Sequence, residues 1–323
     1  MRTILFLLTL LLTLLLTSCG SNTPPSAQSN ASTNDPTHEP FRIAALAPGI
    51  AVIIRDLGHE DLIVARHDFD MICSDSIPKA GSSLGWDLEA LIAANPTHLI
   101  MQRSETAPIS DTLINAAETH NWTIIARPLD TLDDIAILSD DLHYLIEGPP
   151  EREPGEYDIQ SALEHTQPSA RLARAWRDRG PIADNAGRVL ILGSLDPPAA
   201  MGPNSFHHQL IERMGMTPAI TEGAMWIELD YEDLVALKPD SILLFAPRNR
   251  DESDDFGAPE PITGPRALET LGPIAQLPIP ALEHNKVAVI DHPLALLPST
   301  ALADIAHEIE QILETWNEHP PSP

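Results

Sequence analysis

The sequence is short of basic residues, and this shortage excludes one class of function. Lysine and arginine together number 19, against 47 aspartate and glutamate residues, which gives a formal net charge of -28 at pH 7. Binding of nucleic acid requires a basic surface for the phosphates, so this balance argues against a nucleic-acid partner. The acidity instead favours solubility and docking to basic surfaces.

Cysteine is also scarce, since only Cys19 and Cys73 occur. If Cys19 lies outside the folded domain, Cys73 has no partner for an internal disulfide, and a cysteine-based metal cluster is excluded. The sequence has no P-loop and no metal-hydrolase motif. We therefore expect no catalytic site, no cofactor and no metal site. No segment after the N-terminal run is long and apolar enough to be a membrane-span candidate.

The N-terminus has the pattern of a secretion signal. Arg2 and the free amine precede a nearly unbroken apolar run from Ile4 to Leu16. This run is too short to span a bilayer comfortably, but it suits a secretory signal. It ends in Leu-Thr-Ser-Cys19, which resembles a bacterial lipobox, and that resemblance implies acylation of Cys19. The alternative is an ordinary signal peptide that contains a cysteine. We expect residues 1–19 to be a lipoprotein signal peptide and Cys19 to anchor the chain to a membrane, on its extracytoplasmic, periplasmic face.

Residues 20–40 consist largely of Ser, Thr, Asn and Pro. Such a composition cannot bury enough apolar surface to fold, so we expect a disordered tether between the lipid and the domain.

Apolar strand patterns alternate with helical patterns in the rest of the chain. Before residue 148 we expect strands at 41–46, 62–65, 98–101 and 122–126, and helices at 50–57, 87–94, 109–121 and 131–146. After residue 187 we expect strands at 189–192, 241–245 and 287–290, and helices at 205–214, 230–237 and 300–316. This alternation predicts parallel βαβ units in two α/β lobes, at 41–147 and 187–316.

The segment between the lobes, residues 148–186, reads as a linker followed by a helix. A Pro- and Glu-rich break is followed by helical composition from Ile159 to Arg179. Pro168 must either kink this helix or lie in its first turn.

An internal repeat favours two related lobes. Residues 86–100 and 229–243 align with Asp, Glu, an apolar pair and Pro in the same register, 143 positions apart. Each copy reads as a helix, a Pro-terminated turn and a buried strand. The alternative is that any helix-Pro-strand unit produces such a short match.

These residues resemble the helical-backbone class of periplasmic binding proteins, which carry cobalamin, ferric siderophores or haem. The resemblance covers most of residues 41–315. It rests on the order and spacing of five markers: 42–48, 58–65, Lys79-Ala-Gly81, 87–96 and 232–240. It implies two Rossmann-like α/β lobes joined by a long connecting helix, with a ligand cleft between the lobes. It also implies a substrate-binding component of an ABC importer that delivers its ligand to a permease dimer with its ATPase.

The resemblance further implies that Glu89 and Glu232 dock to arginines of the permease, one glutamate from each lobe. Charge complementarity would then set orientation and association rate. The alternative is structural, because a glutamate near a helix N-terminus stabilises the helix dipole.

A ligand should contact loops at the carboxyl ends of the strands. The candidate loops are 47–50, 66–71, 81–86, 102–106, 195–204, 222–226, 247–250 and 291–294. Trp226 is the strongest candidate, since cobalamin-binding relatives place a tryptophan there and aromatic faces suit macrocycles. The other candidate ligand-binding residues are Pro48, His67, Asp68, Ser83, Arg103, Asn204, Arg248 and His292.

Two further patterns bear on the ligand. Arg103, Arg248 and Arg250 could hold an anion, unless they are solvated loop charges. Asp68 and Ser83 stand where a cobalamin site would have tyrosine and tryptophan, which points to a more polar ligand. No paired-histidine motif supports a metal site.

We thus expect a monomer that binds an iron-siderophore, a cobalamin-like or another metal-chelate ligand. The rival interpretation is a lipoprotein enzyme or ligand-sensing receptor that reuses the same fold.

Overall fold

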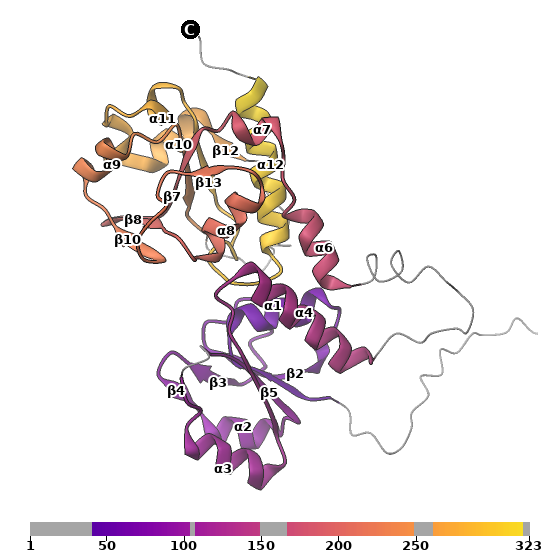
Figure 1. The fold of residues 1–323 in the computed structure, drawn as a ribbon. Helices are drawn as coiled ribbons and strands as arrows, with labels where there is room; N and C mark the ends of the chain where they lie inside the picture. Colours follow the sequence, from indigo (N-terminus) through magenta and orange to yellow (C-terminus); the bar gives the residue numbers. More distant parts are fainter. Residues whose placement is uncertain (1–40, 104–106, 149–166, 249–260, 319–323) are drawn as a thin grey trace, which may run out of the picture. The chain divides into compact units, whose positions relative to one another are not determined.

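A computed structural model describes residues 41–103, 107–148, 167–248 and 261–318. The signal peptide and the tether expected at 1–40 lie outside the described residues. All of the described residues belong to one compact unit. It contains a six-stranded and a seven-stranded sheet, and helices cover both (Figure 1).

The first sheet belongs to what we call the N-terminal lobe. Its strands are β1 (Ile43–Ala45), β2 (Ile63–His67), β3 (Lys79–Ser82), β4 (Gly85–Trp86), β5 (His98–Gln102) and β6 (Thr123–Arg127), in the order β4-β3-β2-β1-β5-β6. All neighbours are parallel except β3 and β4, which form an antiparallel hairpin at the edge.

The helices of this lobe lie on both faces of its sheet, as Figure 1 shows. They are α1 (Pro48–Asp56), η1 (Glu60–Leu62), α2 (Leu88–Ala94), α3 (Asp111–His120) and α4 (Leu132–Glu147). Alternate residues of β1 point to opposite faces: Ile43 packs in the core with α1 and α4, and Ala44 in the core with α2 and α3. A parallel sheet buried on both faces explains the nearly continuous apolar strands.

The second sheet belongs to the C-terminal lobe. Its strands are β7 (Arg188–Leu195), β8 (Pro198–Met201), β9 (Thr217–Pro218), β10 (Trp226–Glu228), β11 (Ser241–Phe245), β12 (Ile262–Thr263) and β13 (Val287–Ile290). Their order is β10-β8-β7-β11-β13-β12, with β9 beside β7. The centre β7-β11-β13 is parallel, whereas β10, β8 and β12 are antiparallel to their neighbours.

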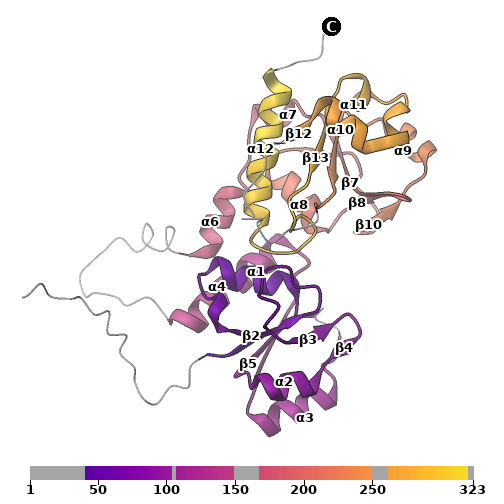
Figure 2. The ribbon, with the colours of Figure 1, turned by 180° about the vertical axis from the view of Figure 1, so that it is seen from behind.

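The remaining helices are α6 (Pro168–Ala175), α7 (Pro181–Asp184), α8 (Phe206–Arg213), α9 (Tyr231–Leu237), α10 (Gly264–Leu271), η2 (Gly272–Gln276), α11 (Pro280–Glu283) and α12 (Leu302–Glu318). Side chains of α9, α10 and α11 pack on one face of the second sheet, and those of α8 and α12 on the other. The view from behind shows α12 running past the strands beside α6 and α7 (Figure 2).

One apolar core runs through both lobes. It contains Ile50 and Ile53 of α1, Leu138 of α4, Leu210 of α8 and Ile305 of α12, all buried. Polar contacts accompany it. The backbone N–H of Leu132 donates to Oε1 of Gln209 over 3.1 Å, and Arg213 pairs with Asp133 at 2.6 Å. The lobes are therefore joined through packed side chains as well as through the chain.

In its described part, the helix expected at 159–179 differs from the prediction. Residues 159–166 lie outside the described residues, and α6 begins at Pro168, which occupies the first turn and causes no kink. The helix ends at Ala175 instead of Arg179. Trp176 is buried, and the backbone N–H of Arg179 donates to the carbonyl of Met214, 3.0 Å away. This bond turns the chain toward the C-terminal lobe and out of the helix.

The internal repeat is confirmed in the structure. Helices α2 and α9 are both seven residues long, and each begins after an aspartate whose side chain accepts a backbone N–H, Asp87 from Ala90 and Asp230 from Asp233. Each ends in a left-handed residue, at Asn95 and Lys238, before a proline and a buried strand. These are standard cap and stop signals.

Candidate functional site

A hollow of about 360 Å³ is lined by residues of both lobes. The carboxyl end of β5 and the loop before α4 provide one side, and β8, β10, the start of α8 and the loop before α12 provide the others. The lining residues are Gln102, Leu129, Asp130, Met201, Ser205, Phe206, His207, Met225, Trp226, Leu296 and Pro298. This volume lies within the range of small-molecule sites.

Large apolar side chains dominate this hollow and are exposed in it. Met225 is 49% exposed, Trp226 47% and Leu296 39%. They come from two segments that are 70 residues apart in the sequence. Exposed apolar side chains that gather around a concave surface mark a binding site more often than singly scattered ones do.

The indole of Trp226 is held by the sheet beneath it. Trp226 begins β10 and pairs with Met201 of β8, and the N–H of Gly202 donates to the carbonyl of Met225 over 2.9 Å. Gly193 of β7 lies directly behind the ring. A Cβ placed on Gly193 would lie 2.7 Å from Cζ3 of Trp226 and would also collide with the methyl group of Met201. The missing side chain at Gly193 therefore makes the room that the indole occupies.

His207 lies deeper in the same wall and is 2% exposed. Its ring packs against Phe206 at 4.1 Å and edge-on against Phe245 at 4.7 Å between centroids. Its Nε2–H donates to the carbonyl of Ala295 over 2.7 Å, so Nε2 carries the proton. Burial lowers the pKa of His207 to about 4. The imidazole is therefore neutral at pH 7.

Of the nine ligand-binding residues predicted from the sequence, the structure places Trp226 in this hollow. Pro48 begins α1, and Asn204 lies in the turn before α8 with a φ of 67°. Arg103 follows β5, and its backbone N–H donates to the carbonyl of Arg127.

The other predicted residues have partners of their own. His67 contacts Asp68 at 3.0 Å, and burial lowers the pKa of its imidazole. Nη1 of Arg248 lies 3.2 Å from Oδ1 of Asp291. His292 is 1% exposed, and its Nδ1 accepts the N–H of Leu294.

Sequence reasoning did not single out Met201, Met225, Leu296, Phe206 or Asp130 as lining residues. Two of the predicted loops, 195–204 and 222–226, contain Met201 and Met225. The methionines in these predicted strand-end loops were therefore the sequence signal that could have identified lining residues. Leu296 lies two residues beyond the predicted loop 291–294.

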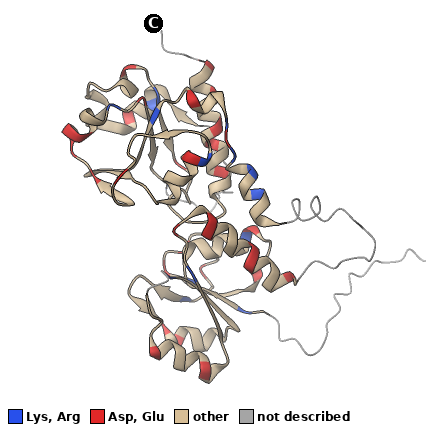
Figure 3. Cartoon of the chain, viewed as in Figure 1, with Lys and Arg blue, Asp and Glu red and all other residues tan. Residues whose placement is uncertain are grey.

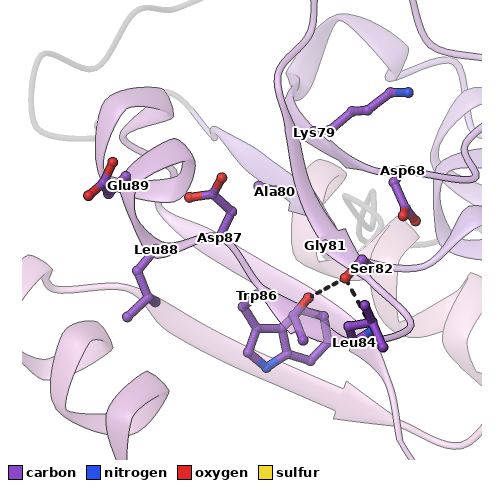
Figure 4. Close-up of a pocket in the computed structure, with 11 residues that line it drawn as sticks. Asp68, Lys79, Ala80, Gly81, Ser82, Leu84, Trp86, Asp87, Leu88 and Glu89 are labelled. Carbon is purple, nitrogen blue, oxygen red and sulfur yellow. Dashed lines mark hydrogen bonds between the residues drawn. The ribbon is translucent and has the colours of Figure 1, made fainter.

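A second, open hollow of about 710 Å³ lies beside α2. Figure 4 shows its lining, which includes Asp68, Lys79, Trp86, Asp87 and Glu89. The β3–β4 hairpin forms its rim, where Oγ of Ser82 donates to the carbonyl of Gly85 over 3.2 Å and accepts the N–H of Leu84. Leu84 at the tip is 97% exposed.

This hairpin contains a Gly-x-Ser-x-Gly motif, which the search of the sequence for catalytic patterns wrongly took to be absent. Residues 81–85 read Gly-Ser-Ser-Leu-Gly, the spacing of a hydrolase nucleophile elbow with Ser83 at its centre. The elbow requires a turn from a strand into a helix, whereas here the residues connect two antiparallel strands. No described histidine or carboxylate is hydrogen-bonded to Ser83. The hairpin therefore does not have the strand-turn-helix geometry of a nucleophile elbow.

Glu89 and Glu232 occupy equivalent positions in the two lobes. Each is the second residue of its helix, α2 or α9, and each is exposed. Among the described residues neither carboxylate has an ion-pair partner. Figure 3 shows acidic residues on helices of both lobes. Both glutamates are thus available to a basic partner.

No helix within the described ranges combines the length and apolarity that crossing a membrane requires. No group of metal-binding side chains is found among the same residues.

No protein-family model matches the sequence. A comparison with curated proteins also finds no match.

Solved structures do match the fold. The periplasmic haem-binding protein HutB of Vibrio cholerae aligns with a TM-score of 0.60 and 19% identity, over 85% of this chain and 98% of HutB. The siderophore periplasmic binding protein from the fuscachelin gene cluster of Thermobifida fusca aligns at 0.59 and 16%, over 85% and 97%. The vitamin B12-binding protein BtuF of Vibrio cholerae aligns at 0.57 and 15%, over 86% and 98%. The chain therefore has the two-lobe fold of the class III periplasmic binding proteins.

Proposed function

We propose that this chain is the substrate-binding component of an ABC importer and captures a metal chelate such as an iron-siderophore or a cobalamin-like ligand. The observation that carries the proposal is the hollow around Trp226, where exposed apolar side chains of the C-terminal lobe lie in a concave surface that residues of both lobes line. A ligand in this position would contact both lobes at once. Ligand binding without a chemical reaction is the simplest function of such a site.

The similar solved structures support this proposal through their fold, since HutB, the fuscachelin-cluster protein and BtuF are binding proteins for haem, a siderophore and vitamin B12, respectively.

Delivery to a permease is the second part of the proposal. Glu89 and Glu232 would each meet a basic side chain on one half of a permease dimer that works with its ATPase. The internal repeat supports this, because it gives both lobes the same helix with a glutamate at the same turn. Two equivalent carboxylates would suit a partner with two equivalent halves.

The third part of the proposal is a lipid anchor at Cys19. It would hold a monomeric, extracytoplasmic protein on the periplasmic face of a membrane, with residues 20–40 as the tether. The sequence Leu-Thr-Ser-Cys after a short apolar run supports this part.

Ligand capture can be tested through tryptophan fluorescence. All five tryptophans lie in the described part of the chain, and Trp226 is the one that is exposed. Titration with hemin, cyanocobalamin and a ferric siderophore should give saturable quenching by at least one probe, with no chemical turnover. Trp226→Phe should remove most of that signal. Trp316→Phe, which alters a buried ring of α12, should retain it.

Two results would contradict the proposal. One is the absence of quenching by all probes, together with native mass spectra of protein from its own cells that show no bound molecule. The other is conversion of a probe to product.

A further inference from the structure

The described lining of the Trp226 hollow carries very little charge. Most of the lining side chains are apolar, and those of Gln102 and Ser205 are polar but carry no charge. His207 is neutral at pH 7 because burial lowers its pKa to about 4, although the hydrogen bond to the Ala295 carbonyl opposes this shift. The remaining ionisable group of the lining is the carboxylate of Asp130, which is exposed.

Several arginines of the described chain are committed to other carboxylates. Arg127 pairs with Asp141 at 3.2 Å, and Arg213 pairs with Asp133 at 2.6 Å. Arg248, which the sequence suggested as an anion ligand, bonds both the side chain and the carbonyl of Asp291. No arginine or lysine belongs to the described lining of the hollow. A bidentate clamp for an anion is therefore missing from these walls.

The walls instead provide an apolar shelf. The indole of Trp226 and the thioether of Met201 lie together over Gly193, and Met225 extends the surface beside them. Leu296 and Phe206 line the same hollow. Aromatic and thioether groups bind flat apolar faces well, whereas an anion placed among them loses its hydration without gaining a partner.

We propose that this cleft selects ligands of zero or positive net charge that lay an apolar face on the Trp226–Met201 shelf, and that Asp130 sets the charge preference. This inference rests on the proposed function and narrows it, because anionic chelates such as tris-catecholates become poor ligands. Gly193 is the positioning residue of the shelf. The charge preference and the shelf are separate properties, so they can be tested separately.

The experiment compares two ferric probes of similar size and opposite charge with the full chain. One is a cationic ferric trihydroxamate and the other an anionic ferric tris-catecholate, with cyanocobalamin as a neutral probe. Affinities are measured by calorimetry at low and moderate salt. We expect the cationic or neutral probe to bind at least tenfold more tightly than the anion. The preference of cation over anion should shrink at higher salt because the Coulomb interaction is screened.

Variants assign the effect to residues. Asp130→Asn should lower the ratio of cation to anion affinity about tenfold, the effect of one charge at several ångströms in a partly solvated site. Asp130→Lys should reverse the order. The matched control Asp111→Asn, an exposed carboxylate at the start of α3, should leave the ratio unchanged. Gly193→Ala should weaken all bound probes alike, because it displaces the indole without altering charge.

The outcomes separate this inference from the proposed function. Tight binding of the anionic probe, or an unchanged ratio in Asp130→Asn, would overturn the charge preference and leave ligand capture standing. If none of the three probes binds and protein from its own cells carries no ligand, the proposed function fails together with the inference.

Discussion

At the scale of single residues, Glu308 of α12 has the most unusual environment. Its side chain is fully buried in the C-terminal lobe. Burial, reinforced by the nearby carboxylate of Asp291 and opposed by Arg248, raises the pKa of Glu308 to about 8. The folded protein therefore holds this carboxyl group protonated at neutral pH, whereas the unfolded chain ionises it near pH 4.5.

Glu308→Gln should remove a pH-dependent loss of stability. Below about pH 4.5 both states of the wild-type chain bind the proton, so Glu308 causes no loss. Between about pH 4.5 and 8 the unfolded chain alone releases it, and the free energy of unfolding falls by up to about 1.4 kcal/mol per pH unit. The accumulated loss above pH 8 is roughly 3–5 kcal/mol.

Denaturant titrations across this pH range check the prediction. The difference in unfolding free energy between variant and wild type should grow with pH and level off near pH 8. Glu314→Gln, an exposed change on the same helix, should give a flat difference. A flat difference for Glu308→Gln as well would show that the carboxyl group is ionised in the folded state.

Residue-scale contacts also show what the sequence could not reveal about the site. Arg248 was predicted to face a ligand because it lies in a strand-end loop. Its guanidinium group instead forms an ion pair with Asp291, which follows a different strand and lies 43 residues further along the chain. Leu296 and Met201 line the same hollow because the fold of the C-terminal lobe brings together segments that are 95 residues apart in the sequence. Such pairings depend on tertiary distances, which periodicity and composition do not contain.

At the scale of elements, the N-termini of α2 and α9 are the proposed docking points. Charge reversal at both, Glu89→Arg with Glu232→Arg, should abolish ligand uptake while affinity for the ligand stays within a few fold. Both aspartate caps remain intact, so the helices should persist, although a cation near a helix N-terminus costs about 0.3–1 kcal/mol.

Uptake assays and calorimetry on the same variant measure the two properties. The swap Glu118→Arg with Glu314→Arg, on exposed faces of α3 and α12, serves as a matched control and should transport normally. A parallel loss of affinity and uptake in the docking variant would place the two glutamates in ligand binding instead.

The central elements were predictable because their sequence signals are local. Apolar runs marked β5, β7, β11 and β13, and Asp caps with prolines beyond the C-termini marked α2 and α9. The edge strands β4, β10 and β12 were not predicted, since each has two or three residues and forms by pairing with a neighbour. Strands β3 and β8 were missed because Gly, Ala and Pro dominate them, and these residues have a low β-propensity.

At the scale of the whole molecule, the proposed anchor predicts where the chain is found. Cys19→Ala should leave the protein unlipidated and release it from membranes, because the thiol that would carry the lipid is removed. Metabolic labelling with a fatty acid, followed by fractionation, measures both effects. Cys73→Ala is the matched control, since Cys73 is buried in the fold and its substitution should leave labelling intact. Equal labelling of Cys19→Ala and wild type would contradict the anchor.

The apolar core shared by α1, α4, α8 and α12 bears on how fast a ligand can be captured. Any wide hinge motion would expose this core to water, at about 25 cal/mol for each Å² uncovered. Capture should therefore not wait for a slow opening step. In stopped-flow mixing, the observed rate should rise linearly with ligand concentration, as expected for a preformed site limited by encounter. A plateau at high concentration would reveal a conformational gate. Such a site would retain its ligand because dissociation is slow, and not because the lobes close around it. The residence time of the ligand would then decide how much of it reaches the membrane.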